Sequence, residues 1–147
     1  MPRSRLGTIA PPLARGCQLA LAVVLLYSAS VHLSNPYAYI LSMSRYGITY
    51  NEPFLSVLAY LFPVAHTALA VWLLAGFNPR CCLLLTSVLM AVYAGAQAFA
   101  VSGGNEIPCG CFSHTSTATV SWRTVATPAA CEITALLGAA LTRRGRS

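Results

Sequence analysis

The sequence contains no lysine and no aspartate, and only 8% of its 147 residues are charged. A soluble domain usually carries about a quarter charged residues, so this composition excludes an ordinary soluble domain. All nine basic residues are arginine, and no basic stripe with interleaved aromatic residues is present. We therefore expect no nucleic-acid partner, and the net charge of +6 suits contact with anionic lipid headgroups.

Motifs for common catalytic chemistry are also missing. The chain has no phosphate-binding loop, no nucleotide fingerprint, no Ser/His/Asp arrangement and no outward pair of carboxylates. Hydrolase and transferase activities have no support, and no cofactor is predicted. Thiol-disulfide oxidoreductase activity is left open by these absences.

Long apolar runs dominate what is present, with 56% hydrophobic residues and a mean hydropathy of +0.65. A helix needs roughly 20 residues to cross a hydrocarbon core about 30 Å thick. Four runs meet this length, at residues 16–34, 54–76, 80–101 and 124–142. No internal repeat or low-complexity segment divides them. The sequence predicts one all-α domain over residues 1–147, a polytopic membrane four-helix bundle embedded in the lipid bilayer.

The arginines predict the orientation of this bundle. Only Arg45 and Arg123 fall on one side of a four-span topology, and the other side carries Arg3, Arg5, Arg15, Arg80, Arg143, Arg144 and Arg146. The positive-inside rule places the second set in the cytoplasm. Both termini are then cytoplasmic, and the loops 35–53 and 102–123 face outward from the cell inner (cytoplasmic) membrane. A cleaved signal peptide is the rival interpretation of the first run, but that run is longer than a usual signal core.

Two cysteines one residue apart lie in the second outer loop. A bridge between Cys109 and Cys111 would close a tight ring that is easier to reduce than an ordinary structural disulfide. Gly110 permits the backbone angles of such a ring. This pattern favours redox exchange. A structural bridge, including one from this pair to Cys131, and a soft-metal site with His114 remain as alternatives.

The remaining cysteines occupy the predicted helices. Cys131 lies about 10 Å below the outer end of the last helix, as an auxiliary candidate. Cys17, Cys81 and Cys82 lie at the cytoplasmic ends, where thiols stay reduced and free cysteine behaves as a small apolar residue.

Two ionisable residues are predicted well inside the bilayer. His66 lies about 18 Å and Glu132 about 12 Å from the outer ends of their helices, close enough in depth for a pair. Such groups are costly in lipid and usually face the bundle interior with a partner. We expect Glu132 to relay protons for thiol chemistry with His66 as its partner, or the two to satisfy each other in the core. His32, level with the cysteine loop, is a further auxiliary candidate.

Tyrosines cluster in the first outer loop, at Tyr37, Tyr39, Tyr46 and Tyr50. We interpret them, together with Arg45, as an interfacial aromatic belt and not as a quinone site. Trp72 and Trp122 are interpreted in the same way. Electron flow to a quinone would need a second redox pair or a docking site, and the sequence shows neither.

Three segments carry a resemblance to a known family: "HLSNPYAYI" leaving the first helix, Pro63 followed by an apolar run to Gly76, and "CGCF" after the third helix. From about Leu19 to Leu141 the chain resembles the methylamine-utilisation protein MauE family, within the wider DoxX- and DoxD-like four-helix membrane proteins. Two positions depart from the family pattern: Ser113 stands where glycine is usual, and His66 replaces a glutamate.

The resemblance implies redox handling outside the cytoplasmic membrane. MauE is required for the accumulation of methylamine dehydrogenase, whose small subunit is rich in disulfides, and works beside a thioredoxin-like partner. We therefore expect an integral membrane thiol/disulfide protein that assists disulfide formation or maturation of exported proteins through Cys109 and Cys111. Its partner would be an extracytoplasmic thioredoxin-like protein or a folding substrate. A non-catalytic assembly scaffold is the alternative.

Overall fold

The computed structural model describes residues 5–46, 49–103 and 121–144, which are helical almost throughout and contain no strand. Four of the helices are long and apolar enough to cross a membrane, so the predicted all-α membrane bundle is confirmed. The helices are α1 (Arg5–Ser34), α2 (Pro36–Arg45), α3 (Glu52–Ala75), α4 (Pro79–Ser102) and α5 (Trp122–Arg144).

Helix α2 lies inside the segment that was expected to be a loop. Asn35 ends α1 and also begins α2, because its side-chain oxygen accepts a hydrogen bond of 3.0 Å from the backbone N–H of Ala38. Pro36 then occupies the first turn, where its missing N–H costs nothing. The expected helix stop at Asn35-Pro36 is therefore also a helix start, and α2 leaves the end of α1 at a steep angle.

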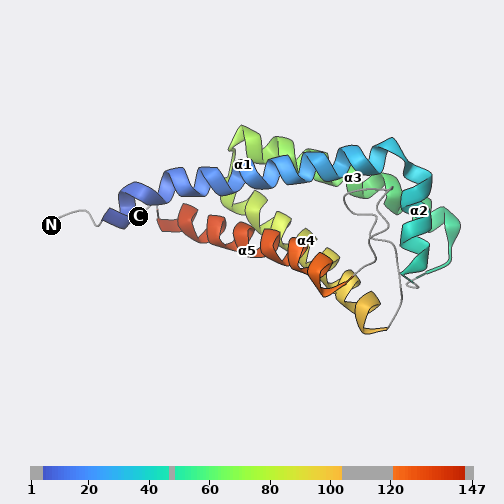
Figure 1. The fold of residues 1–147 in the computed structure, drawn as a ribbon. Helices are drawn as coiled ribbons and strands as arrows, with labels where there is room; N and C mark the ends of the chain where they lie inside the picture. The colour runs from blue at the N-terminus through green and yellow to red at the C-terminus, as the bar shows by residue number, and fades with distance from the viewer. Residues whose placement is uncertain (1–4, 47–48, 104–120, 145–147) are drawn as a thin grey trace.

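The long helices form two pairs (Figure 1). Helix α1 runs along α3 and α5 runs along α4, while α1 also packs on α5. Helices α3 and α4 meet over a shorter stretch, and the two pairs diverge toward the end of the bundle that carries α2. The start of α1 and the end of α5 lie together at the opposite end.

The buried core joins α1, α3, α4 and α5 through small and aliphatic residues: Leu21, Ala22, Leu25, Ala70, Leu73, Cys82, Leu83, Met90, Ala135 and Ala139. Gly138 shows how closely the helices approach, since a Cβ added there would lie 3.2 Å from Cβ of Cys17 and 3.2 Å from Cδ1 of Leu83. Small residues at helix contacts are the usual means of close packing in lipid.

Arg15 joins α1 to the last turn of α3. Its guanidinium donates hydrogen bonds to the carbonyl oxygens of Leu73 (3.0 Å) and Leu74 (2.8 Å) and to Oε1 of Gln18 (2.9 Å). The last carbonyls of a helix have no partner within the helix, and a cation there also interacts favourably with the helix dipole. Gly76 ends α3 with a left-handed φ of 69°, and any side chain at that position would crowd Arg15.

Candidate functional site

Two of the predicted site residues, Cys109 and Cys111, lie outside the described residues, as does His114. The described helices nevertheless show where that segment is attached. Helix α4 ends at Ser102 and α5 begins at Trp122, and both ends lie toward the α2 end of the bundle.

The four cysteines of the described residues carry free thiols. Cys81 is exposed, Cys82 is buried and its thiol contacts the carbonyl oxygen of Leu69 at 3.5 Å, and Cys17 and Cys131 are half-buried. Cys82 belongs to the core, as expected for a cysteine that serves as a small apolar residue, and Cys131, the auxiliary candidate, packs against that core.

A cluster of two histidines and two tyrosines occupies the interior near α2. Four different helices contribute one ring each: His32 from α1, Tyr39 from α2, His66 from α3 and Tyr93 from α4. His32 stacks on Tyr39 with ring centroids 3.9 Å apart, and His66 stacks on Tyr93 at 5.5 Å. The two tyrosine hydroxyls are 3.0 Å apart and hydrogen-bond to each other, and the two histidine rings are 6.3 Å apart. We call these four residues the His–Tyr cluster.

The turn after α1 creates the first half of this cluster. Because Asn35 and Pro36 restart the helix at once in a new direction, Tyr39 of α2 comes to stack on His32 of α1. Tyr39 is only 5% exposed, whereas Tyr37 and Tyr50 are 77% and 80% exposed. Tyr37 and Tyr50 are thus exposed, while Tyr39 is buried, and the aromatic belt stays a prediction.

His66 lies one turn after Pro63 in α3 and is 1% exposed. Neither of its ring nitrogens has a hydrogen-bond partner among the residues that the structure describes. A buried polar group without a partner costs about 1–3 kcal/mol, so such a group calls for a water, an ion or a ligand.

A small cavity of about 30 Å³ adjoins His66 and Cys131, with Ser28, Gln97 and Pro128 also on its wall. A space of roughly 10–15 Å³ is enough for one water molecule, so a water here has room beside the imidazole. Cys131 from α5 and His66 from α3 are thus brought to one internal space.

Glu132 forms no hydrogen bond with His66. The ring of His66 faces His32 and Tyr93, and none of the described residues, Glu132 included, hydrogen-bonds its nitrogens. The predicted pair required the second and fourth membrane helices to touch, but α5 packs mainly on α1 and α4. Equal depth in the bilayer therefore did not produce a hydrogen-bonded pair, and the relay through His66 and Glu132 stays a prediction.

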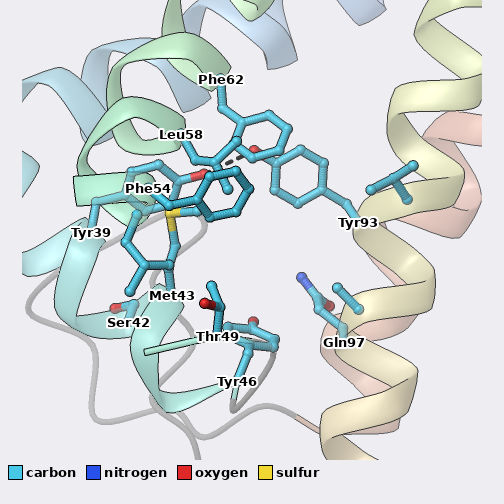
Figure 2. A pocket seen from close by; sticks show the side chains of 13 residues that line it. Tyr39, Ser42, Met43, Tyr46, Thr49, Phe54, Leu58, Phe62, Tyr93 and Gln97 are labelled. Carbon is cyan, nitrogen blue, oxygen red and sulfur yellow. Dashed lines mark hydrogen bonds between the residues drawn. The ribbon is translucent and has the colours of Figure 1, made fainter. Parts of the chain in front are cut away.

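A larger cavity of about 170 Å³ lies between α2, α3 and α4 (Figure 2). Phe54, Leu58 and Phe62 line it from α3, and Tyr93 projects toward them from α4, beside the hydroxyl of Tyr39. Gln97, 2% exposed, lies on the α4 wall and borders both cavities. The cavity is thus apolar and aromatic, with a few hydrogen-bonding groups.

Among the described residues no group of three or more His, Cys, Asp or Glu side chains is arranged to hold a metal ion. The predicted alternative metal site, at Cys109, Cys111 and His114, lies outside this part of the chain.

The family assignment rests on nearly the whole sequence. Residues 10–143 match the sequence model of the family described as methylamine utilisation protein MauE. The chain belongs to the MauE family. No curated protein and no solved structure matches it. The resemblance inferred from the quoted segments is confirmed for the family, and the protein is a multi-pass membrane protein with four apolar helices.

In this MauE-family protein the sequence reasoning missed Tyr93 and Gln97. A signal was available, because the two residues stand four apart in an otherwise apolar run and therefore share one helix face. Polar groups repeated on one face of a membrane helix point to the bundle interior. The sequence did not indicate that Tyr39 is buried, because Tyr39 lies in α2, a helix that was expected to be a loop.

Proposed function

We propose that this protein exchanges disulfides with exported proteins through Cys109 and Cys111, on the outer face of the cytoplasmic membrane. Membership in the MauE family carries this proposal, together with a Cys-Gly-Cys sequence between two membrane helices of a chain that has few charged residues. An exposed thiol pair on the oxidising side requires a chemical reason, and exchange supplies one.

The arginines of the described helices support this orientation. Arg15 and Arg80 stand near the bundle end where α1 starts and α5 finishes, and Arg45 and Arg123 stand toward the α2 end. Arg5, Arg143 and Arg144 lie at the first end as well, so basic residues are more numerous there, and the positive-inside rule assigns that end to the cytoplasm. The α2 end then faces outward, and so does the attachment of residues 104–120.

The proposed exchange conserves atoms and electrons. A thiolate of the client attacks one sulfur of the Cys109–Cys111 disulfide, breaks the S–S bond and forms a mixed disulfide. The second client thiolate then attacks the client sulfur of that mixed disulfide and releases the cysteine pair as two thiols. The client loses two electrons and gains a disulfide, and the pair is reduced. A thioredoxin-like extracytoplasmic partner or a folding substrate is the client that this chemistry fits.

The test is a redox titration in membranes. Thiols are trapped with a mass-tagged maleimide across graded ratios of dithiol to disulfide buffer, with wild type beside Cys111→Ser. We expect a reversible two-electron transition in wild type and a covalent adduct with another protein in the variant. Cys81→Ser, at an exposed cysteine on α4, is the matched control and should leave the transition unchanged.

Three outcomes contradict the proposal. A Cys109–Cys111 bridge that resists strong reductant indicates an assembly scaffold. Cysteines that retain a soft metal ion, lost on His114→Ala, indicate a metal site. A pair that stays reduced without adducts excludes exchange.

Sidedness is tested separately with a membrane-impermeant maleimide on intact cells. Outward placement predicts labelling of Cys109 or Cys111 after reduction, while Cys81 is labelled only after the membrane is opened. The reverse pattern refutes the proposed orientation.

A further inference from the structure

The small cavity beside His66 brings together one imidazole and two sulfur atoms. His66 comes from α3, Met90 from α4 and Cys131 from α5, and all three side chains line this space of about 30 Å³. His66 is 1% and Met90 is 7% exposed, and Cys131 is a half-buried free thiol. Three separate helices thus supply ligand atoms of different chemistry to one internal space.

The nitrogens of His66 are the groups in this space that require a ligand. Both are buried, and neither has a hydrogen-bond partner among the described residues. The rings of His32 and Tyr93 lie nearly parallel to the imidazole, at 23° and 26°, so they stack on its faces. The lone pair of a neutral imidazole lies in the plane of the ring. A ligand in the adjoining cavity is therefore the partner that this lone pair can reach.

The two sulfur atoms distinguish a metal ion from a water molecule. Thiol and thioether groups are weak in hydrogen bonds, so Met90 and Cys131 offer little to a water. The same groups are soft ligands that select copper(I), and imidazole also suits copper. A single ion needs little more room than the roughly 10–15 Å³ of one water, whereas sites for drug-sized molecules measure about 300–1,000 Å³. The size and the chemistry of the cavity agree on one soft ion.

Charge favours a monovalent ion over a divalent one. Copper(I) on the thiolate of Cys131 forms a neutral pair, whereas Zn²⁺ on the same thiolate leaves a positive charge in a place where charge is costly. Structural zinc sites also have four ligands, and the described part of the chain holds no group of three His, Cys, Asp or Glu side chains for one. Calcium and magnesium prefer oxygen ligands, but neither Glu52 nor Glu132 lines this cavity.

We propose that His66, Met90 and Cys131 bind one copper(I) ion in the interior of the membrane bundle. The ion replaces the proton on Sγ of Cys131, this proton passes to water, and no electron is transferred. One nitrogen of His66 and the thioether sulfur of Met90 complete the ligand set, since copper(I) accepts low coordination numbers. The site uses neither cysteine of the Cys-Gly-Cys sequence and goes beyond the exchange proposed above.

The test is a titration with copper(I) under anaerobic conditions. The full-length chain carries Cys109→Ser/Cys111→Ser, so the pair proposed for exchange takes no part, and the protein is held in nanodiscs of phosphatidylcholine. Copper(I) is supplied as its coloured complex with bicinchoninate, and loss of the colour reports transfer to the protein. We expect one ion per chain that withstands this chelator, with both sulfur and nitrogen ligands in the X-ray absorption spectrum.

Each ligand is then removed from this parent chain. Cys131→Ser and His66→Phe should each weaken copper(I) binding by more than about a hundredfold, beyond the range typical of outer-shell residues. Met90→Leu conserves the volume and removes only the weaker thioether ligand, so it should weaken binding about tenfold. The nitrogen signal should disappear from the absorption spectrum of His66→Phe.

Matched controls change the same residue types outside the small cavity. Cys17→Ser removes a second half-buried free thiol, on α1, and Met43→Leu removes the thioether of a methionine on α2 that lines the large cavity. Both should bind copper(I) as the parent chain does. Circular dichroism and gel filtration establish that each variant is folded, and Met90→Leu and His66→Phe still decide the question if Cys131→Ser is not.

Three outcomes overturn the site. In the first, no copper(I) is held against bicinchoninate, as for a cavity that contains only water. In the second, copper(I) is lost in Cys17→Ser and retained in Cys131→Ser, which places it on other thiols. In the third, the parent chain and the three ligand variants have equal affinity. Because the Cys109 and Cys111 thiols are absent throughout, none of these results bears on the proposed exchange, which its own redox titration tests.

Discussion

Replacing His66 by phenylalanine should leave the fold intact and make it slightly more stable. The imidazole is 1% exposed, and its nitrogens have no hydrogen-bond partner among the described residues, so burial costs about 1–3 kcal/mol. Phenylalanine removes that cost, keeps a ring against Tyr93 at the present centroid distance of 5.5 Å, and extends into the adjoining cavity of about 30 Å³. After some loss to crowding, we expect a gain of about 1 kcal/mol.

The assay is thermal unfolding in detergent, followed by circular dichroism. A gain of about 1 kcal/mol corresponds to a rise in Tm of about 3 °C for a chain of this size. His66→Ala is the contrasting variant, because it leaves a hole in the core and should lower the stability by about 2–4 kcal/mol. If His66→Phe is destabilised as much as His66→Ala, the nitrogens of His66 are paired in the folded protein and the reasoning is wrong.

Three further predictions concern the framework of the site. Arg15→Ala should lower the stability by about 1–2 kcal/mol in the same assay, since the last turn of α3 loses its donor, and an unchanged Tm would contradict this role. Gly138→Val should lower the stability by about 1–3 kcal/mol, because neighbouring side chains lie 3.2 Å from an added Cβ. Gly16→Ala has open space around it and should raise the stability by about 0.5–1 kcal/mol. Equal Tm shifts in the two variants would refute the close helix packing at Gly138. Asn35→Ala should weaken α2 by about 1 kcal/mol and loosen Tyr39, which is measured as increased hydrogen exchange in residues 36–45, with unchanged exchange as the contrary result.

The parts of this fold that follow from local sequence were predictable. Each long apolar run became a membrane helix, because in lipid the backbone has no alternative to internal hydrogen bonds. Helix α2 was missed because Asn35 and Pro36 serve both as a helix end and as a helix start. Because polar residues and tyrosines follow Asn35 and Pro36, the sequence pattern indicates a helix end followed by a loop, and the helix start is overlooked.

The site depended on helix neighbours, which a single sequence does not supply. His66 and Glu132 were matched by depth, but depth does not say which helices touch, and α3 instead faces α1, α2 and α4. His32 was expected to lie level with the cysteine loop, but its stacking on Tyr39 follows from the change of chain direction between α1 and α2. The Cys109–Cys111 prediction is chemical and stays a prediction.

The His–Tyr cluster has a consequence for biogenesis. No helix carries two of its four rings, and the small cavity beside it draws a wall residue from α5 as well. Helices insert into a membrane one by one and associate afterwards, so the cluster does not exist at the insertion stage. Any redox or ligand-binding competence that uses it begins only when the whole chain has been synthesised and packed, and a truncated protein would be inserted but inert.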